Sequence, residues 1–176
     1  NETAMEGAVY VGDNWALSDR LSVDYGVRYS MFKSNKFYSA PEIRLSGRYL
    51  FNEKVSVKAG FNSMRQYVHM ISNTVAVSPT DTWKLSDKDI APQKGWQAGA
   101  GVYTSVLDDK VEHSLEAYYK RMSNYLDFKG GAQLVMNSNV AEDVVGVKGR
   151  AYGVELMVSK PLGKLNGWAS YTWSRS

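Results

Sequence analysis

The stretch LSVDYGVRYSM, residues 21–31, alternates strictly between apolar and polar side chains. Its odd positions read Leu, Val, Tyr, Val, Tyr and Met, and the even positions between them read Ser, Asp, Gly, Arg and Ser. Successive side chains of a β-strand point to opposite faces, so this period of two predicts a strand with one apolar and one polar face.

The same alternation returns along the whole chain. It predicts eight strands, at residues 8–17, 21–31, 42–51, 55–62, 96–106, 111–120, 151–159 and 165–175. Because the pattern is repeated so often, it favours an all-β architecture of antiparallel strands that run up and down.

The links between these strands fall into two classes. Short links rich in Asp, Asn, Pro and Gly occur at residues 18–19, 52–54, 107–110 and 161–164. Long links occur at residues 33–40, 67–94 and 123–148. Short turns at one end and long loops at the other are typical of the periplasmic and extracellular ends of an outer-membrane β-barrel.

The turn at residues 107–110 also predicts a strand register. It sets Val106 opposite Val111, and therefore Val102 opposite Leu115 and Gly101 opposite Glu116. A slip of one residue would move Glu116 to the apolar face.

Composition agrees with a membrane barrel without proving one. The chain has 176 residues, 44% of them hydrophobic, a net charge of +3 and no cysteine, and its mean hydropathy is -0.37. No apolar run is long enough for a membrane-spanning helix, but a barrel places its lipid-facing residues at every second position. The lack of cysteine excludes a disulfide scaffold and a thiolate metal site.

Aromatic residues help to separate a membrane barrel from a soluble barrel or sandwich, because both types alternate. On the apolar face they fall at two levels, with aliphatic or small residues between them and Tyr25 as the exception. Two such girdles favour a bilayer. The predicted lipid-interface aromatics are Trp15, Tyr49 and Phe51 near the short links, and Tyr29, Phe61, Trp96, Tyr119, Tyr152, Tyr171 and Trp173 near the long links.

The opposite face is too charged for an apolar interior. It carries Asp24, Arg28, Arg44, Arg48, Lys58, Glu112, Glu116, Lys120 and Glu155. A water-filled lumen fits these charges, and the solvated outer face of a soluble sheet is the alternative.

Three segments resemble the late barrel region of TonB-dependent outer-membrane receptors of the Bacteroidetes type. They are PTDTWKLSDKDIAPQKGWQAGAGVY (79–103), SLEAYYKRMSNYLDFKGGAQL (114–134) and GRAYGVELMVSKPLGKLNGWASYTWSRS (149–176). WALSDRLSVDYGVRYSMF (15–32) is also typical of this family. The resemblance implies a barrel of roughly twenty-two strands with an N-terminal plug domain, which imports a scarce nutrient with energy delivered by TonB.

We therefore expect residues 1–176 to form about eight strands, as four hairpins, of a larger transmembrane β-barrel in the bacterial outer membrane. The sequence contains no recognisable signal peptide, plug or TonB-contacting segment, and the phase of the links predicts that both of its ends lie at the cell surface. The expected partners are outer-membrane lipid, the rest of the barrel, the plug domain, TonB through that plug, and a surface lipoprotein. The nutrient belongs to the siderophore, glycan, peptide or vitamin class.

No constellation of residues predicts an enzyme, a cofactor or a metal site. His69 and His113 are isolated and are interpreted as structural, and Asp87 and Asp89 lack the further oxygen ligands that calcium needs. Basic and acidic residues are interleaved, which disfavours binding to nucleic acid.

Ligand binding is instead expected in the long loops. Tyr67, His69 and Trp83 in one loop, and Tyr125, Phe128 and Gln133 in another, offer stacking faces and hydrogen bonds. The alternative is that these residues pack loop against loop to form a lid. A second alternative concerns the whole chain, which would then be a self-contained small β-barrel or β-sandwich that binds a ligand or a surface partner.

Overall fold

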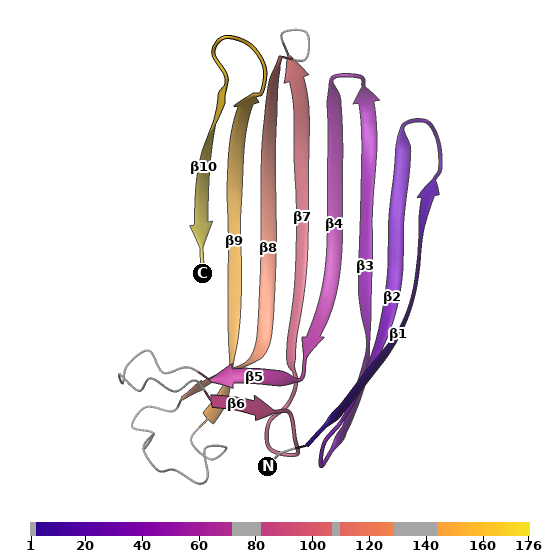
Figure 1. Cartoon of the computed structure of the whole chain (residues 1–176), viewed down its shortest axis with the longest axis vertical. Coiled ribbons are helices and arrows are strands. Elements are labelled where there is room, and N and C mark those ends of the chain that lie inside the picture. Colours follow the sequence, from indigo (N-terminus) through magenta and orange to yellow (C-terminus); the bar gives the residue numbers. More distant parts are fainter. Residues whose placement is uncertain (1–2, 72–81, 107–109, 129–143) are drawn as a thin grey trace.

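The chain forms one large β-sheet and a separate hairpin, in a computed structural model that describes residues 3–71, 82–106, 110–128 and 144–176 (Figure 1). The eight strands of the large sheet are β1 (Met5–Ala16), β2 (Leu21–Lys33), β3 (Phe37–Asn52), β4 (Val55–Gln66), β7 (Gln93–Val106), β8 (Val111–Phe128), β9 (Val144–Lys160) and β10 (Gly167–Arg175). The hairpin consists of β5 (Val68–Ile71) and β6 (Thr82–Leu85).

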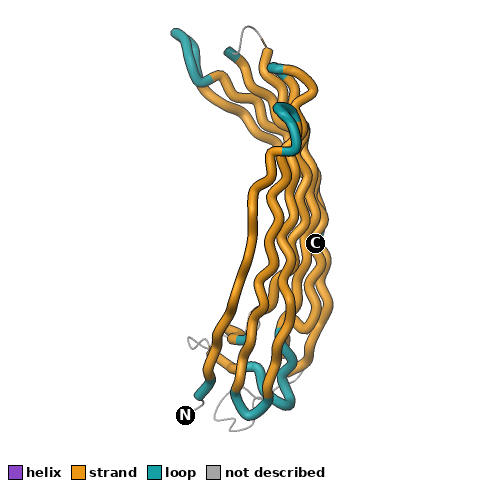
Figure 2. The backbone as a smooth tube through the Cα atoms, turned by 90° about the vertical axis from the view of Figure 1, so that its right-hand side faces the viewer, coloured by secondary structure: helices purple, strands orange, loops and turns teal. Residues whose placement is uncertain are grey.

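Strand order in the large sheet follows the chain, β1-β2-β3-β4-β7-β8-β9-β10, and each neighbouring pair is antiparallel. The prediction of an all-β, up-and-down architecture is therefore confirmed. β1 and β10 form the two edges of an open sheet, which appears as one bent layer in the edge-on view (Figure 2). Among the described residues, no helix is long and apolar enough to cross a membrane.

The predicted register between β7 and β8 is confirmed. Val106 lies opposite Val111, Val102 opposite Leu115, and Gly101 opposite Glu116. Because residues that face each other on neighbouring strands share a face, this register extends the two faces of each strand across the whole sheet.

We call the two faces outer and inner. The outer face carries aliphatic residues, which include Val27, Leu45, Val57, Leu115 and Val154. The inner face carries the charged residues, which include Asp24, Arg44, Lys58, Glu116 and Glu155. Leu115 is 50% exposed, as expected for a large apolar side chain on a surface that no second layer covers.

All eight predicted strands are present, but several are longer than the sequence pattern indicated. β3 already begins at Phe37, which lies opposite Lys33, so residues 34–36 form a tight connection where a loop over 33–40 was expected. We call the end of the sheet that carries the connections at 17–20, 53–54 and 161–166 the short-turn end. The opposite end, where β2 joins β3 and the segment with β5 and β6 joins β4 to β7, is the long-loop end (Figure 1).

β8 and β9 also continue into the link predicted over residues 123–148. A bulge interrupts their register between Met122 and Tyr125, and Asn124 at this bulge has a φ of 59°. Asn tolerates this left-handed conformation better than most residues. The bulge adds a residue and shifts the alternation by one position, so Tyr125, opposite Val147, lies on the inner face. This break in the period of two explains why the sequence pattern ended the strand too early.

The few buried side chains gather at the long-loop end. The buried hydrophobic residues are Phe32, Ala40, Tyr67 and Ile90, and the buried polar ones at this end are Ser30, Glu42, His69 and Ser86. The hairpin β5–β6 lies across the strands there (Figure 1) and belongs to the link predicted over residues 67–94 as a loop. The hairpin thus creates a small local core against a sheet that is otherwise a single layer.

Tyrosine rings cover glycines on the inner face. The Tyr118 ring lies over Gly153 on β9, where a Cβ atom would come within 2.9 Å of the Tyr118 hydroxyl and 2.7 Å of the Trp173 carbonyl oxygen. Such close approach leaves room for hydrogen only. The aromatic ring compensates for the missing glycine side chain and helps to fix the register.

We expect Gly153→Ala to lower the free energy of unfolding by about 1–3 kcal/mol in the intact receptor, because the new methyl group meets a backbone oxygen that cannot move freely. Gly7→Ala is the matched control, since a Cβ there meets nothing within 4 Å. Urea unfolding in lipid vesicles measures both. Equal stabilities of the two variants would contradict the close packing of Tyr118 on Gly153.

Candidate functional site

The predicted interface aromatics share the outer face. The rings of Phe61, Trp96, Tyr119, Tyr152 and Trp173 form a continuous line across β4, β7, β8, β9 and β10, with neighbouring centroids 5.4 to 6.1 Å apart. We call this line the aromatic ladder. Tyr171 lies one outer-face position from Trp173, toward the short-turn end, and Tyr29 lies on β2 opposite Pro41.

The second group of aromatics lies at the short-turn end of the outer face. Trp15 is next to the first turn and opposite Val23, and the Tyr49 and Phe51 rings meet edge to face at 4.9 Å. Tyr25 stands between the two levels, opposite Leu45. The structure thus arranges these rings at two levels of one face, and their contact with lipid stays a prediction.

A row of charges crosses the inner face. Arg48 lies opposite Lys58 on β3 and β4, and Glu116 lies opposite Glu155 on β8 and β9, with Gly101 of β7 between the two pairs. Like charges directly opposite each other destabilise a sheet. Within the described ranges, none of these four side chains forms an ion pair.

Tyr103 connects the two halves of this row. Its ring lies over Gly101, the Lys58 ammonium nitrogen is 4.5 Å from its centroid, and its hydroxyl hydrogen-bonds to Glu116. Lys58, Tyr103 and Glu116 line a groove of about 480 Å³ that extends to the short-turn end. A larger hollow of about 1180 Å³ lies over β1 to β4 and β7 and is lined by Arg44, Asn62 and other residues. The inner face is therefore polar and hollowed in two places.

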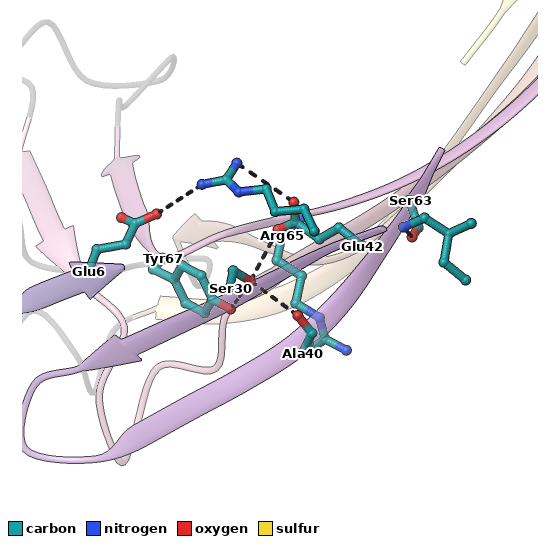
Figure 3. A network of polar contacts seen from close by, with 9 residues as sticks. Glu6, Ser30, Ala40, Glu42, Ser63, Arg65 and Tyr67 are labelled. Carbon is teal, nitrogen blue, oxygen red and sulfur yellow. Dashed lines mark hydrogen bonds and ion pairs between the residues drawn. The ribbon is translucent and has the colours of Figure 1, made fainter. Parts of the chain in front are cut away.

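At the long-loop end, a buried polar network connects the segment that carries β5 and β6 (residues 67–86, the hairpin segment) to the large sheet (Figure 3). The Tyr67 ring stacks on Phe32 at 4.9 Å, and its hydroxyl is 2.8 Å from the Ser30 hydroxyl. Ser30 also donates to Glu42 at 3.3 Å, and the Arg28 guanidinium lies 3.7 Å from the Glu42 carboxylate. The backbone N–H of Arg65 donates to Glu42 as well.

Ser86, at the end of the hairpin segment that follows β6, makes two further hydrogen bonds. His69 Nε2 and the Ser86 hydroxyl are 2.9 Å apart, and the Ser86 carbonyl accepts a 2.7 Å hydrogen bond from the Ser34 hydroxyl. The His69 Nδ1 atom is buried and has no hydrogen-bond partner among the described residues, and burial lowers the pKa of this side chain. The neutral imidazole is therefore favoured, because a second proton would place a positive charge in a buried site where no described residue accepts a hydrogen bond from Nδ1.

The predicted ligand-binding residues separate into two groups. Tyr67 and His69 are only 3% exposed; Tyr67 contacts Phe32 and Ser30 of β2, and His69 hydrogen-bonds to Ser86. Trp83 and Tyr125 are 64% and 48% exposed and can meet a ligand. Gln133 and the side chain of Phe128 lie outside the described part of the chain. Sequence reasoning missed Ser30 and Glu42, because polar residues at their inner-face positions look like lumen residues.

Among the remaining sequence candidates, Asp87 stabilises a turn and His113 lies within a strand. The Asp87 carboxylate accepts 2.8 Å hydrogen bonds from the backbone N–H groups of Asp89 and Ile90, so it stabilises a turn. His113 lies on β8 opposite Thr104 and Val158. In the described part of the chain, no three His, Cys, Asp or Glu residues are grouped so that they could hold a metal ion.

Family comparison agrees with this two-faced wall. The family model described as "TonB dependent receptor-like, beta-barrel" matches residues 1–176. The chain belongs to this family. No curated protein matches the chain in sequence.

Solved structures of two outer-membrane receptors and an iron transporter show a similar fold. The pyoverdine outer-membrane receptor FpvA from Pseudomonas aeruginosa matches with a TM-score of 0.68 and 18% identity over 97% of this chain and 25% of its own length. The alcaligin outer-membrane receptor FauA from Bordetella pertussis gives 0.65 and 16%, over 97% of this chain and 30% of its own. The FrpB iron transporter from Neisseria meningitidis gives 0.68 and 12%, over 99% and 26%. The chain thus spans between a quarter and a third of these proteins.

We expect the hairpin of this TonB-dependent receptor-like barrel to loosen in mild acid. Because the docked hairpin holds His69 neutral with a lowered pKa, its contribution to docking is complete above the ordinary histidine pKa of about 6.5 and is lost as the pH falls below that value. Amide hydrogen exchange in β5 and β6 of the full receptor, corrected for intrinsic rates, should accelerate between pH 7 and pH 5. His69→Gln cannot titrate and should abolish this dependence, so an equal acceleration in both proteins would contradict the role of His69.

Proposed function

We propose that this chain is wall and outer-loop structure of an outer-membrane importer that takes up a scarce nutrient with energy from TonB. The observation that carries the proposal is the single layer with two different faces, one of aliphatic residues and aromatic rings and one of polar and charged residues. A soluble barrel or sandwich would instead cover its apolar face with a second layer or with its own interior. Family membership and the open edges of the sheet support the same choice.

In this proposal the outer face contacts lipid. The aromatic ladder lies at one interface, and Trp15, Tyr49 and Phe51 lie at the other, with the aliphatic band between them in hydrocarbon. The short-turn end faces the periplasm and the long-loop end faces the outside of the cell, as is general for such barrels. Further strands of the same barrel pair with the exposed edges of β1 and β10.

The inner face is proposed to receive the plug domain. The centres of the two like-charge pairs, Arg48 with Lys58 and Glu116 with Glu155, lie three strand spacings apart, which is about 14 Å if neighbouring strands are 4.8 Å apart. A plug surface with acidic and basic groups at that spacing would neutralise both pairs and remove the repulsion. The plug would in turn carry the segment that contacts TonB, and a surface lipoprotein is a further proposed partner at the outer loops.

Trp83 and Tyr125 are the proposed ligand contacts of this part of the receptor, with Phe128 and Gln133 retained from the sequence prediction. Tyr67 and His69 would act on the ligand by fixing the hairpin that presents Trp83. We propose a metal chelate as the first nutrient class to test, because the similar solved structures include pyoverdine and alcaligin receptors. No enzymatic reaction is expected.

We expect Leu115→Arg to destabilise the intact receptor by about 2–4 kcal/mol, because it places a guanidinium in the hydrocarbon. Ser114→Arg, its inner-face neighbour in the open groove, should cost much less. Unfolding in phospholipid vesicles measures both. Comparable losses at the two positions would refute the lipid-facing assignment.

The transport proposal predicts that uptake depends on both the receptor and TonB. Cells that lack the receptor gene and cells that lack TonB should both lose accumulation of radioactive iron supplied as a ferric siderophore, and the gene on a plasmid should restore it only where TonB is present. Uptake that survives the loss of TonB would exclude active import by this barrel. Normal iron uptake in cells without the receptor would exclude the supplied chelate as its cargo.

A further inference from the structure

Basic residues stand beside the aromatic ladder on the outer face. Four adjacent strands each contribute one, namely Arg65 of β4, Lys94 of β7, Arg121 of β8 and Arg150 of β9. Arg65 lies opposite Lys94, and Arg121 lies opposite both Trp96 and Arg150. We call these four residues the basic belt. It follows the ladder on the side of the long-loop end.

The belt has no internal counter-charge. β4 and β7 contain no acidic residue, and on β8 and β9 the acids Glu112, Glu116 and Glu155 lie on the inner face. Asp127 of β8 lies beyond the bulge, opposite Val145, and is also on the inner face. Within the described ranges, none of the four belt side chains forms an ion pair.

This arrangement carries an energetic cost. Arg65 with Lys94 and Arg121 with Arg150 are like-charge pairs directly opposite each other, which destabilises a sheet. An anion bound between the two residues of each pair would turn this repulsion into a net attraction and so stabilise the sheet. Guanidinium groups suit phosphate in particular, because their parallel N–H groups match two phosphate oxygens.

A groove joins the belt to the aromatic ladder. It has a volume of about 390 Å³ and opens among Arg65, Lys94 and Arg121 on one side and Phe61 and Trp96 on the other. A ligand that fits it has a phosphate at one end and an apolar part at the other. A small soluble anion would use the cations alone and leave the rings exposed.

We propose that the basic belt binds the phosphate-bearing headgroup of a lipid in the outer leaflet, with the acyl chains running along the aliphatic band below the aromatic ladder. The proposal rests on the proposed function, because it requires the outer face to meet lipid and the long-loop end to face outward. It adds a specific headgroup site to a wall that would otherwise contact lipid only through apolar side chains. Basic residues at a membrane interface attract anionic headgroups in the same way elsewhere.

The test uses the full receptor in neutral detergent. The two probes are lipid A with both phosphates and the same lipid without them, and native mass spectrometry counts the bound lipid molecules. The wild type should retain the phosphorylated lipid and not the dephosphorylated one. Arg121→Gln with Arg150→Gln should weaken binding by roughly 10-fold or more, because two charge-assisted hydrogen-bond donors are lost. Lys160→Gln is the matched control, since Lys160 lies on the outer face of β9 at the short-turn end.

A second measurement checks the folded state of the double variant. In detergent without lipid, removal of the Arg121–Arg150 repulsion should leave the thermal midpoint unchanged or raise it. Adding the phosphorylated lipid should raise the midpoint of the wild type and not that of the double variant.

Equal binding of both lipids, or an equal loss in Lys160→Gln, would overturn the belt and leave the lipid-facing wall intact. If inorganic phosphate displaces the phosphorylated lipid from the wild type, the belt is a site for free anions, and this result would also overturn the proposal. A receptor that stays folded and monodisperse without detergent and binds neither lipid would instead contradict the proposed function itself.

Discussion

Backbone hydrogen bonding between neighbouring strands is the constraint on which this structure depends. Most of the sheet is one layer, so the side chains of its middle have no second layer to pack against, and Leu115 remains half exposed. The antiparallel ladders of the large sheet therefore hold the wall together, and inside a bilayer any unpaired backbone group would cost several kcal/mol. The register that these ladders fix decides on which face of the sheet each side chain lies. A slip of one residue between β7 and β8 would turn Glu116 outward and Leu115 inward.

Register also explains how a single sheet keeps two different faces. The outer face gathers rings and aliphatic side chains, while the inner face gathers charges, and both faces place like charges side by side, as in the Arg48–Lys58 and Arg121–Arg150 pairs. Such pairs lower the stability of the isolated sheet. Under the proposed function, a lumenal domain on the inner side and an anionic lipid on the outer side would neutralise these pairs. The stability of the sheet would then depend on what is bound to its two faces.

The long-loop end is built on a different principle. Here the Tyr67–Phe32 stack, the Ser30–Glu42 hydrogen bond and the His69–Ser86 hydrogen bond form a small core with buried polar groups. This core holds the β5–β6 hairpin against the wall and leaves Trp83 exposed. A rigid hairpin that presents an aromatic side chain loses less conformational entropy on binding than a free loop would. Because burial lowers the pKa of His69, we expect the same attachment to weaken in acid.

The sequence by itself determined the strands, their up-and-down order, the two faces and the register at the 107–110 turn, because a period of two and tight turns are local properties of the chain. It also indicated the two levels of outer-face aromatics. Only the tertiary structure decided where strands continue past the pattern, since the Asn124 bulge shifts the alternation without any apolar signal. It alone separated Tyr67 and His69, which are buried, from Trp83 and Tyr125, which are exposed, because burial depends on contacts between segments far apart in the sequence, such as Ser30 with Tyr67. The basic belt has the same origin: four cations scattered from residue 65 to residue 150 become neighbours only when the strands that carry them pair.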